Sequence, residues 1–187
     1  MPRLADPAVR SPWPDVGLAA VLCLVYIGLY YLTEAAMGNE VVGGVASLFF
    51  PAAFVRLFGF LVVGFWIVPA LLLAAMACID LGLPLESRMV VAAFLAVGGP
   101  LGTWVTAQLC RLDLNLANLT PQRLLVLSIG CSLGNAVFYH LGLVSVGFPD
   151  HGVTTHLATF VGDTFGTWAI IYLIKTGLTL YGRSIRR

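Results

Sequence analysis

The chain has 187 residues, of which 59% are hydrophobic and 10% charged, and its mean hydropathy is +0.95. Soluble domains carry about 25% charged residues, so this chain has too few polar side chains to cover a water-exposed surface. The same numbers exclude intrinsic disorder, and a net charge of +1 offers no basic surface to a nucleic acid. Because the apolar runs are continuous and not alternating, we expect one all-α integral membrane domain over residues 1–187 and no β-barrel.

Six apolar segments of the chain are predicted to cross the bilayer, which takes about 20 residues per helix. The apolar run 45–79 is too long for one helix, so we expect a hairpin that turns near Gly64. Thr120 followed by Pro121 predicts an N-cap and a first helical residue for the fifth span. The predicted spans are residues 16–33, 45–64, 64–79, 89–110, 124–141 and 155–180.

The distribution of arginine predicts the orientation in the membrane. If both termini lie in the cytoplasm, Arg88 is the one arginine on the opposite side, beside several acidic residues. Such a bias follows the positive-inside rule, so we expect a multi-pass protein of the bacterial inner membrane with both termini cytoplasmic. The first span is longer than the apolar region of a signal peptide and is predicted to be permanent. The arginines expected in the cytoplasm are Arg3, Arg10, Arg111, Arg123, Arg183, Arg186 and Arg187.

Small residues recur at helical spacing in the last three predicted spans. Such residues allow helix backbones to approach closely in lipid, and we expect them to pack helices of the same chain. The glycines concerned are Gly98, Gly99 and Gly102 around Pro100, then Gly130 with Gly134, and Gly162 with Gly166.

Two ionisable residues fall deep inside predicted spans. Arg56 lies about ten residues from the outer start of the second span, or roughly 15 Å deep, and Asp163 lies roughly 12 Å from the same side at 1.5 Å per residue. A charge at mid-bilayer costs at least ~2.5–3.5 kcal/mol and requires a partner or water. Since the two depths match, we predict an Arg56–Asp163 ion pair.

Further polar side chains fall on the same outer half of the membrane. At 100° per residue, His156, Thr159 and Asp163 share one face of the sixth span. Asn135 and His140 occupy the outer half of the fifth span. These groups suggest a pocket that opens outward, and two interpretations stay open: a site for a small-molecule ligand or ion, and a structural polar network.

The residues give no sign of an enzyme or of a bound metal. No nucleophile motif, phosphate-binding loop or pair of catalytic carboxylates is present. The histidines His140, His151 and His156 match no compact ligand spacing, and the four cysteines form no C-x-x-C pair. We therefore expect neither catalysis nor a cofactor.

Two stretches of the chain carry a family resemblance. Phe50–Ala53 with Gly64–Ala70 resembles the aromatic and proline-rich hairpin of MASE1-type bacterial membrane sensor domains. Phe160–Gly166 is similar to the Gly-Asp-x-x-Gly element in a late helix of that family. The resemblance implies a membrane sensor whose output lies in a fused signalling domain. This chain has no such domain, so a partner chain is expected to supply the output.

A second resemblance is to the substrate-binding components of energy-coupling-factor transporters, which are small six-helix proteins. The leading hypothesis is a non-enzymatic membrane module that senses a ligand or serves as a subunit of a larger inner-membrane complex. The alternative is the solute-binding component of a transporter, and a haem- or metal-binding electron-transfer subunit ranks third. The expected partners are the lipid bilayer, another membrane or cytoplasmic chain and a small-molecule ligand.

Overall fold

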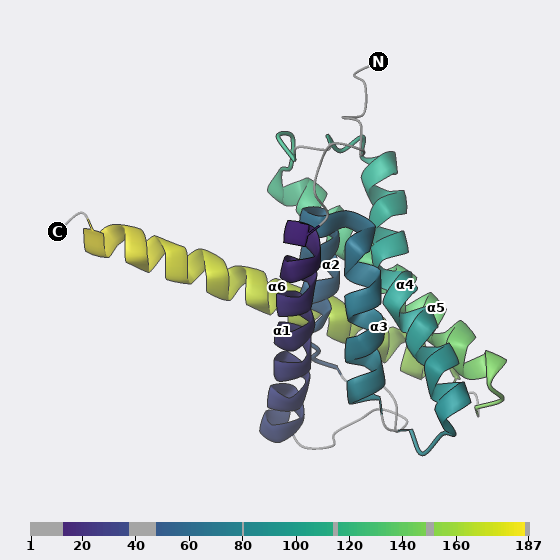
Figure 1. The fold of residues 1–187 in the computed structure, drawn as a ribbon. Coiled ribbons are helices and arrows are strands. Elements are labelled where there is room, and N and C mark those ends of the chain that lie inside the picture. The colour runs from purple at the N-terminus through teal and green to yellow at the C-terminus, as the bar shows by residue number, and fades with distance from the viewer. Residues whose placement is uncertain (1–12, 38–47, 80, 114–115, 149–151, 186–187) are drawn as a thin grey trace.

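A computed structural model of the chain describes residues 13–37, 48–79, 81–113, 116–148 and 152–185. Over these residues the regular structure is helical, and five stretches are long and apolar enough to cross a membrane. The chain is therefore a multi-pass helical membrane protein, and Figure 1 shows α6 crossing the other helices obliquely and projecting beyond them. The helices are α1 (Trp13–Met37), α2 (Ala53–Val63), the 3-10 helix η2 (Gly64–Trp66), α3 (Ile67–Cys78), α4 (Leu85–Leu109), α5 (Pro121–Ser145) and α6 (Gly152–Ile185).

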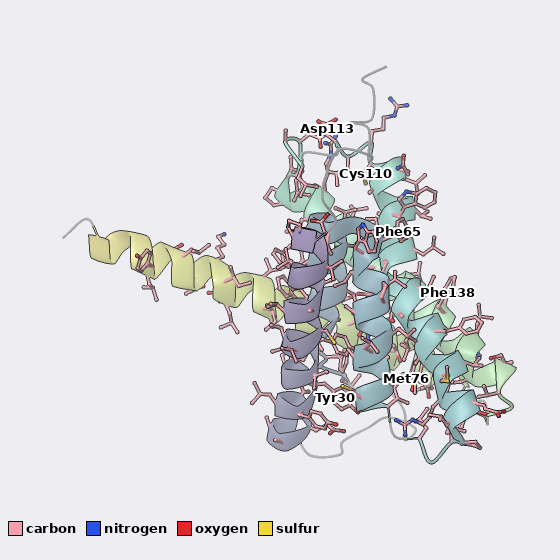
Figure 2. The ribbon with its side chains drawn as sticks, viewed as in Figure 1. Tyr30, Phe65, Met76, Cys110, Asp113 and Phe138 are labelled. Atoms are coloured by element: carbon pink, nitrogen blue, oxygen red, sulfur yellow. The ribbon has the colours of Figure 1, made fainter. Side chains whose placement is uncertain are left out.

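The predicted reversal near Gly64 is confirmed. Gly64 has a φ of +61°, which ends α2, and a Cβ added to Gly59 would lie 2.6 Å from Ile67 Cγ1. Eight residues of continuous helix would separate these positions by about 12 Å. Figure 2 places Phe65 toward one end of the bundle and Met76 toward the other, near Tyr30. The chain therefore runs up through α2, turns at η2 and returns through α3.

The predicted start of the second span is wrong. Of the predicted helix, residues 45–47 lie outside the described residues, and the chain is not helical from Leu48 to Ala52. Pro51 lacks the N–H that a continuing helix would need, and a tight turn instead pairs the Ala53 N–H with the Phe50 carbonyl. With 11 and 12 residues, α2 and α3 are each shorter than the ~17 residues of a full span. Together with η2 they form one of the five long apolar stretches.

The short helix α2 lies at the centre of the bundle. It contacts α1, α3, α4, α5 and α6, and its side chains Val55 and Leu57 are fully buried. Leu57 packs against Leu127 and Cys131 of α5. An 11-residue helix has little surface of its own, so its position depends on these neighbours.

The glycines of α4 and α5 make the closest helix contact, as predicted. A Cβ on Gly134 would lie 2.5 Å from the Gly98 oxygen and 2.8 Å from Gly102 Cα, and one on Gly102 would overlap the carbonyl of Gly130. The packing is within one chain. The predicted N-cap is also confirmed, because the Thr120 hydroxyl accepts from the Arg123 N–H at 3.2 Å.

Gly134→Ala is expected to lower the thermal stability of the protein in detergent. The added methyl meets backbone atoms of α4 that cannot rotate away, and overpacking of this kind costs about 1–3 kcal/mol. Gly28→Ala is the matched control, because nothing lies within 4 Å of its Cβ position on α1. Thermal unfolding that is equal for the two variants would show that the α4–α5 contact tolerates a wider spacing.

Candidate functional site

The candidate site is built around Arg56, which lies in the first turn of α2 and is 4% exposed. The predicted position of Arg56 within its helix is wrong, because α2 begins at Ala53 and Arg56 is its fourth residue and not about its tenth. Its guanidinium NH1 donates to Asp163 Oδ2 at 2.9 Å, and the carboxylate is equally buried. The predicted Arg56–Asp163 ion pair is therefore present.

Side chains from two further helices form hydrogen bonds with this ion pair. Asn135 of α5 donates its Nδ2 to Asp163 Oδ2 at 2.6 Å, and Arg56 NH2 donates to the Tyr26 hydroxyl of α1 at 2.7 Å. One acceptor remains open, because the buried Oδ1 of Asn135 has no hydrogen-bond partner among the residues that the structure describes. Four helices thus meet at one buried polar network (Tyr26, Arg56, Asn135 and Asp163).

Aromatic rings enclose the guanidinium from two sides. Its central carbon lies 5.4 Å from the ring centroid of Tyr26 and 5.2 Å from that of Phe50, and the two rings meet edge to face. A guanidinium within about 6 Å of a ring is attracted to its π-face, more strongly where water is absent. The rings therefore replace part of the hydration that Arg56 loses on burial.

The non-helical segment before α2 is held against α6 by its backbone. The Phe50 N–H donates to the Gly162 carbonyl at 3.0 Å, and a Cβ on Gly166 would overlap the Phe50 carbonyl. Irregular backbone is tolerated at membrane depth only where protein satisfies its polar groups. The glycines of α6, with the ion pair beside them, provide that environment, which gives Gly162 and Gly166 a role that packing motifs alone did not predict.

A second polar cluster lies on the same two helices, farther along. The ring nitrogens Nε2 of His156 and Nδ1 of His140 face each other between α6 and α5, with ring centroids 3.6 Å apart. His140 is five residues from Asn135, and His156 is seven from Asp163, or about 8–10 Å along each axis. The predicted pocket is thus resolved into two clusters, the buried polar network and this histidine pair.

The remaining predicted residues contribute less to either cluster. The Thr159 hydroxyl donates to the carbonyl of Thr155 within α6, a bond that saturates a polar group in lipid. His151 lies outside the described residues. Within the described ranges, no three His, Cys, Asp or Glu side chains converge to hold a metal ion.

Sequence reasoning missed Tyr26 and Phe50. An aromatic residue inside a span usually reads as lipid-facing or interfacial, so neither stood out. The available signal was Pro51, since a proline within an apolar run marks a place where the backbone leaves the helix and needs a partner.

No protein-family model, curated protein or solved structure matches the chain. The geometry of the two clusters is accordingly what supports a functional proposal.

Removing either partner of the ion pair is expected to destabilise the protein strongly. Arg56→Met and Asp163→Leu each leave one buried charge without its counter-charge, a change that costs about 3–5 kcal/mol. The double variant Arg56→Met/Asp163→Leu is expected to recover much of that loss, because apolar side chains of similar volume remove both charges together. Thermal unfolding of the four proteins in detergent measures the coupling.

The matched control is Arg88→Met. Among the described residues, the side chain of Arg88 donates to one backbone carbonyl, that of Met76, so its removal is expected to cost about 1 kcal/mol. Strictly additive losses for Arg56→Met and Asp163→Leu would contradict the energetic role assigned to the pair.

Proposed function

We propose that this chain is a non-enzymatic module of the bacterial inner membrane that senses a ligand or serves as a subunit of a larger membrane complex. In this proposal α6 connects the buried polar network to a partner chain. The observation that supports it is the continuity of α6, a single helix of 34 residues. Asp163 lies in its buried part, and its C-terminal part projects from the bundle (Figure 1).

The exposed part of α6, residues 172–181, is the surface proposed to receive the partner. Its exposed side chains are large and apolar, among them Tyr172 and Tyr181, each 67% exposed, and Leu173, which is 63% exposed. A ligand changes the position of a helix only if it binds two arrangements with different affinity. The buried polar network is the place where such a difference would arise, because four helices meet there and one carbonyl oxygen of Asn135 is open.

A second proposal concerns topology: six passes with both termini in the cytoplasm. The alternating direction of the helices supports it, with α2 and α3 as the two arms of the central hairpin. The α4–α5 connection, which carries Arg111, and the first turn of α5, which carries Arg123, lie toward the end of the bundle where α1 begins (Figure 1). That end would face the cytoplasm under the positive-inside rule.

Reporter fusions after Arg187 and within residues 149–151 are expected to report opposite compartments, the first cytoplasmic and the second periplasmic. Alkaline phosphatase and a fluorescent protein fused at the same sites give complementary signals and serve as each other's control. Equal signals at both sites would refute the six-pass topology.

Purification of the full chain from membranes of its host in mild detergent tests the function. The proposal predicts a stoichiometric partner chain that is lost when Tyr172 and Leu173 are replaced by serine. The control replaces Leu24 and Leu32, which are similarly exposed on α1, and is expected to keep the partner. A partner retained equally by both variants, or no partner at all, would contradict the role of α6.

The alternative function is the solute-binding component of a transporter. The open Asn135 Oδ1 favours it, since a buried acceptor without a donor is what a bound solute would satisfy. A small molecule that copurifies and is identified by mass spectrometry supports this alternative. Its loss in Asn135→Leu, with retention in Arg88→Met, would place the solute at the buried polar network.

A further inference from the structure

An apolar groove lies between α2 and the part of α6 that leaves the bundle. It is open and has a volume of about 530 Å³. The wall on α2 consists of Phe54 and Phe58, whose rings stack with centroids 5.2 Å apart. The wall on α6 consists of Ile171, Ile174, Lys175, Leu178 and Thr179.

Lys175 distinguishes this groove from an ordinary lipid-facing surface. It is the single lysine of the chain, it is exposed, and none of the residues that line the groove is acidic. In the described part of the chain, the one ion pair joins Arg56 and Asp163 and leaves Lys175 out. An apolar groove with an unneutralised ammonium on its wall is complementary to an amphiphile with an anionic end.

Lys175 lies on α6 between the level of the buried polar network and the headgroup region of one leaflet. Asp163 lies 11 residues after the start of α6, or up to ~16 Å along the axis, which is near the middle of a hydrocarbon core of ~30 Å. Lys175 follows twelve residues later, up to ~18 Å farther along. Because α6 runs obliquely to the other helices (Figure 1), this axial length is an upper limit on the depth that Lys175 reaches, and its long side chain extends the ammonium the remaining way to the lipid phosphates.

We propose that this groove binds one anionic phospholipid, with an acyl chain against Phe54, Phe58 and Ile174 and the headgroup phosphate at Lys175. In a bilayer such a groove is filled by an acyl chain unless a protein helix covers it, so the ammonium supplies the selectivity. Basic pockets between membrane helices are a known mode of recognition of anionic headgroups. The site is separate from the buried polar network and does not depend on the sensing role.

Native mass spectrometry of the purified chain, with dioleoylphosphatidylglycerol or dioleoylphosphatidylcholine added to the detergent, tests the proposal. The wild-type protein is expected to retain phosphatidylglycerol preferentially, and Lys175→Gln to lower its apparent affinity about fivefold, as one surface charge worth ~1 kcal/mol would. Lys175→Arg is expected to keep the preference. Arg183→Gln, eight residues farther along α6, is the matched control for loss of a charge and is expected to bind like the wild type.

The single lysine allows an independent measurement. An amine-reactive reagent modifies only Lys175 and the N-terminal amine, and phosphatidylglycerol is expected to protect Lys175 while phosphatidylcholine and glycerol 3-phosphate do not. Protection by glycerol 3-phosphate would indicate a phosphate site without a lipid tail and would overturn the proposal. So would equal retention of both lipids, a preference that survives Lys175→Gln, or a protein chain that shields Lys175.

Discussion

The ion pair between Arg56 and Asp163 is the constraint on which the centre of this bundle depends. In a bilayer neither charge can be left without a partner. The two residues are 107 positions apart in the sequence, and their helices bring Arg56 NH1 to 2.9 Å from Asp163 Oδ2. Asn135 and Tyr26 extend the pair to α5 and α1. Four helices are consequently fixed to one another by hydrogen bonds at mid-depth, where apolar contacts between helices have no preference over contacts with lipid.

The same pair explains how the chain accommodates a helix of only 11 residues. Leu48–Ala52 reach the interior without helical hydrogen bonds, and the backbone of α6 at Gly162 and Gly166 receives them. Phe50 contributes both to this contact and to the surroundings of the Arg56 guanidinium. The irregular backbone and the buried charge therefore stabilise each other.

Much of this arrangement could be predicted from the sequence, and the parts that could not be predicted have physical reasons. The length of the apolar run 45–79 and the presence of Gly64 predicted the turn. The similar depths of Arg56 and Asp163 in their spans predicted that the two residues pair. The start of α2 was not predictable from hydropathy, because Leu48–Ala52 are as apolar as a helix would be. Asn135 was expected near Asp163, but its bond to that carboxylate depends on the rotation of α5. Lys175 fell inside the predicted sixth span. The orientation was predicted from the arginines alone, so the position of the single lysine was not used.

The long sequence separation of Arg56 and Asp163 has a consequence for biosynthesis. Arg56 leaves the ribosome 107 residues before its counter-charge, an interval of about 5–20 s at ~5–20 residues per second. Tyr26 and Phe50, which contact its guanidinium, are already synthesised when Arg56 appears, whereas Asp163 is not. The Arg56 guanidinium is therefore without its counter-charge until α6 has been synthesised. A chain whose synthesis stops before Asp163 consequently carries a membrane-embedded arginine without the carboxylate that neutralises it in the finished fold.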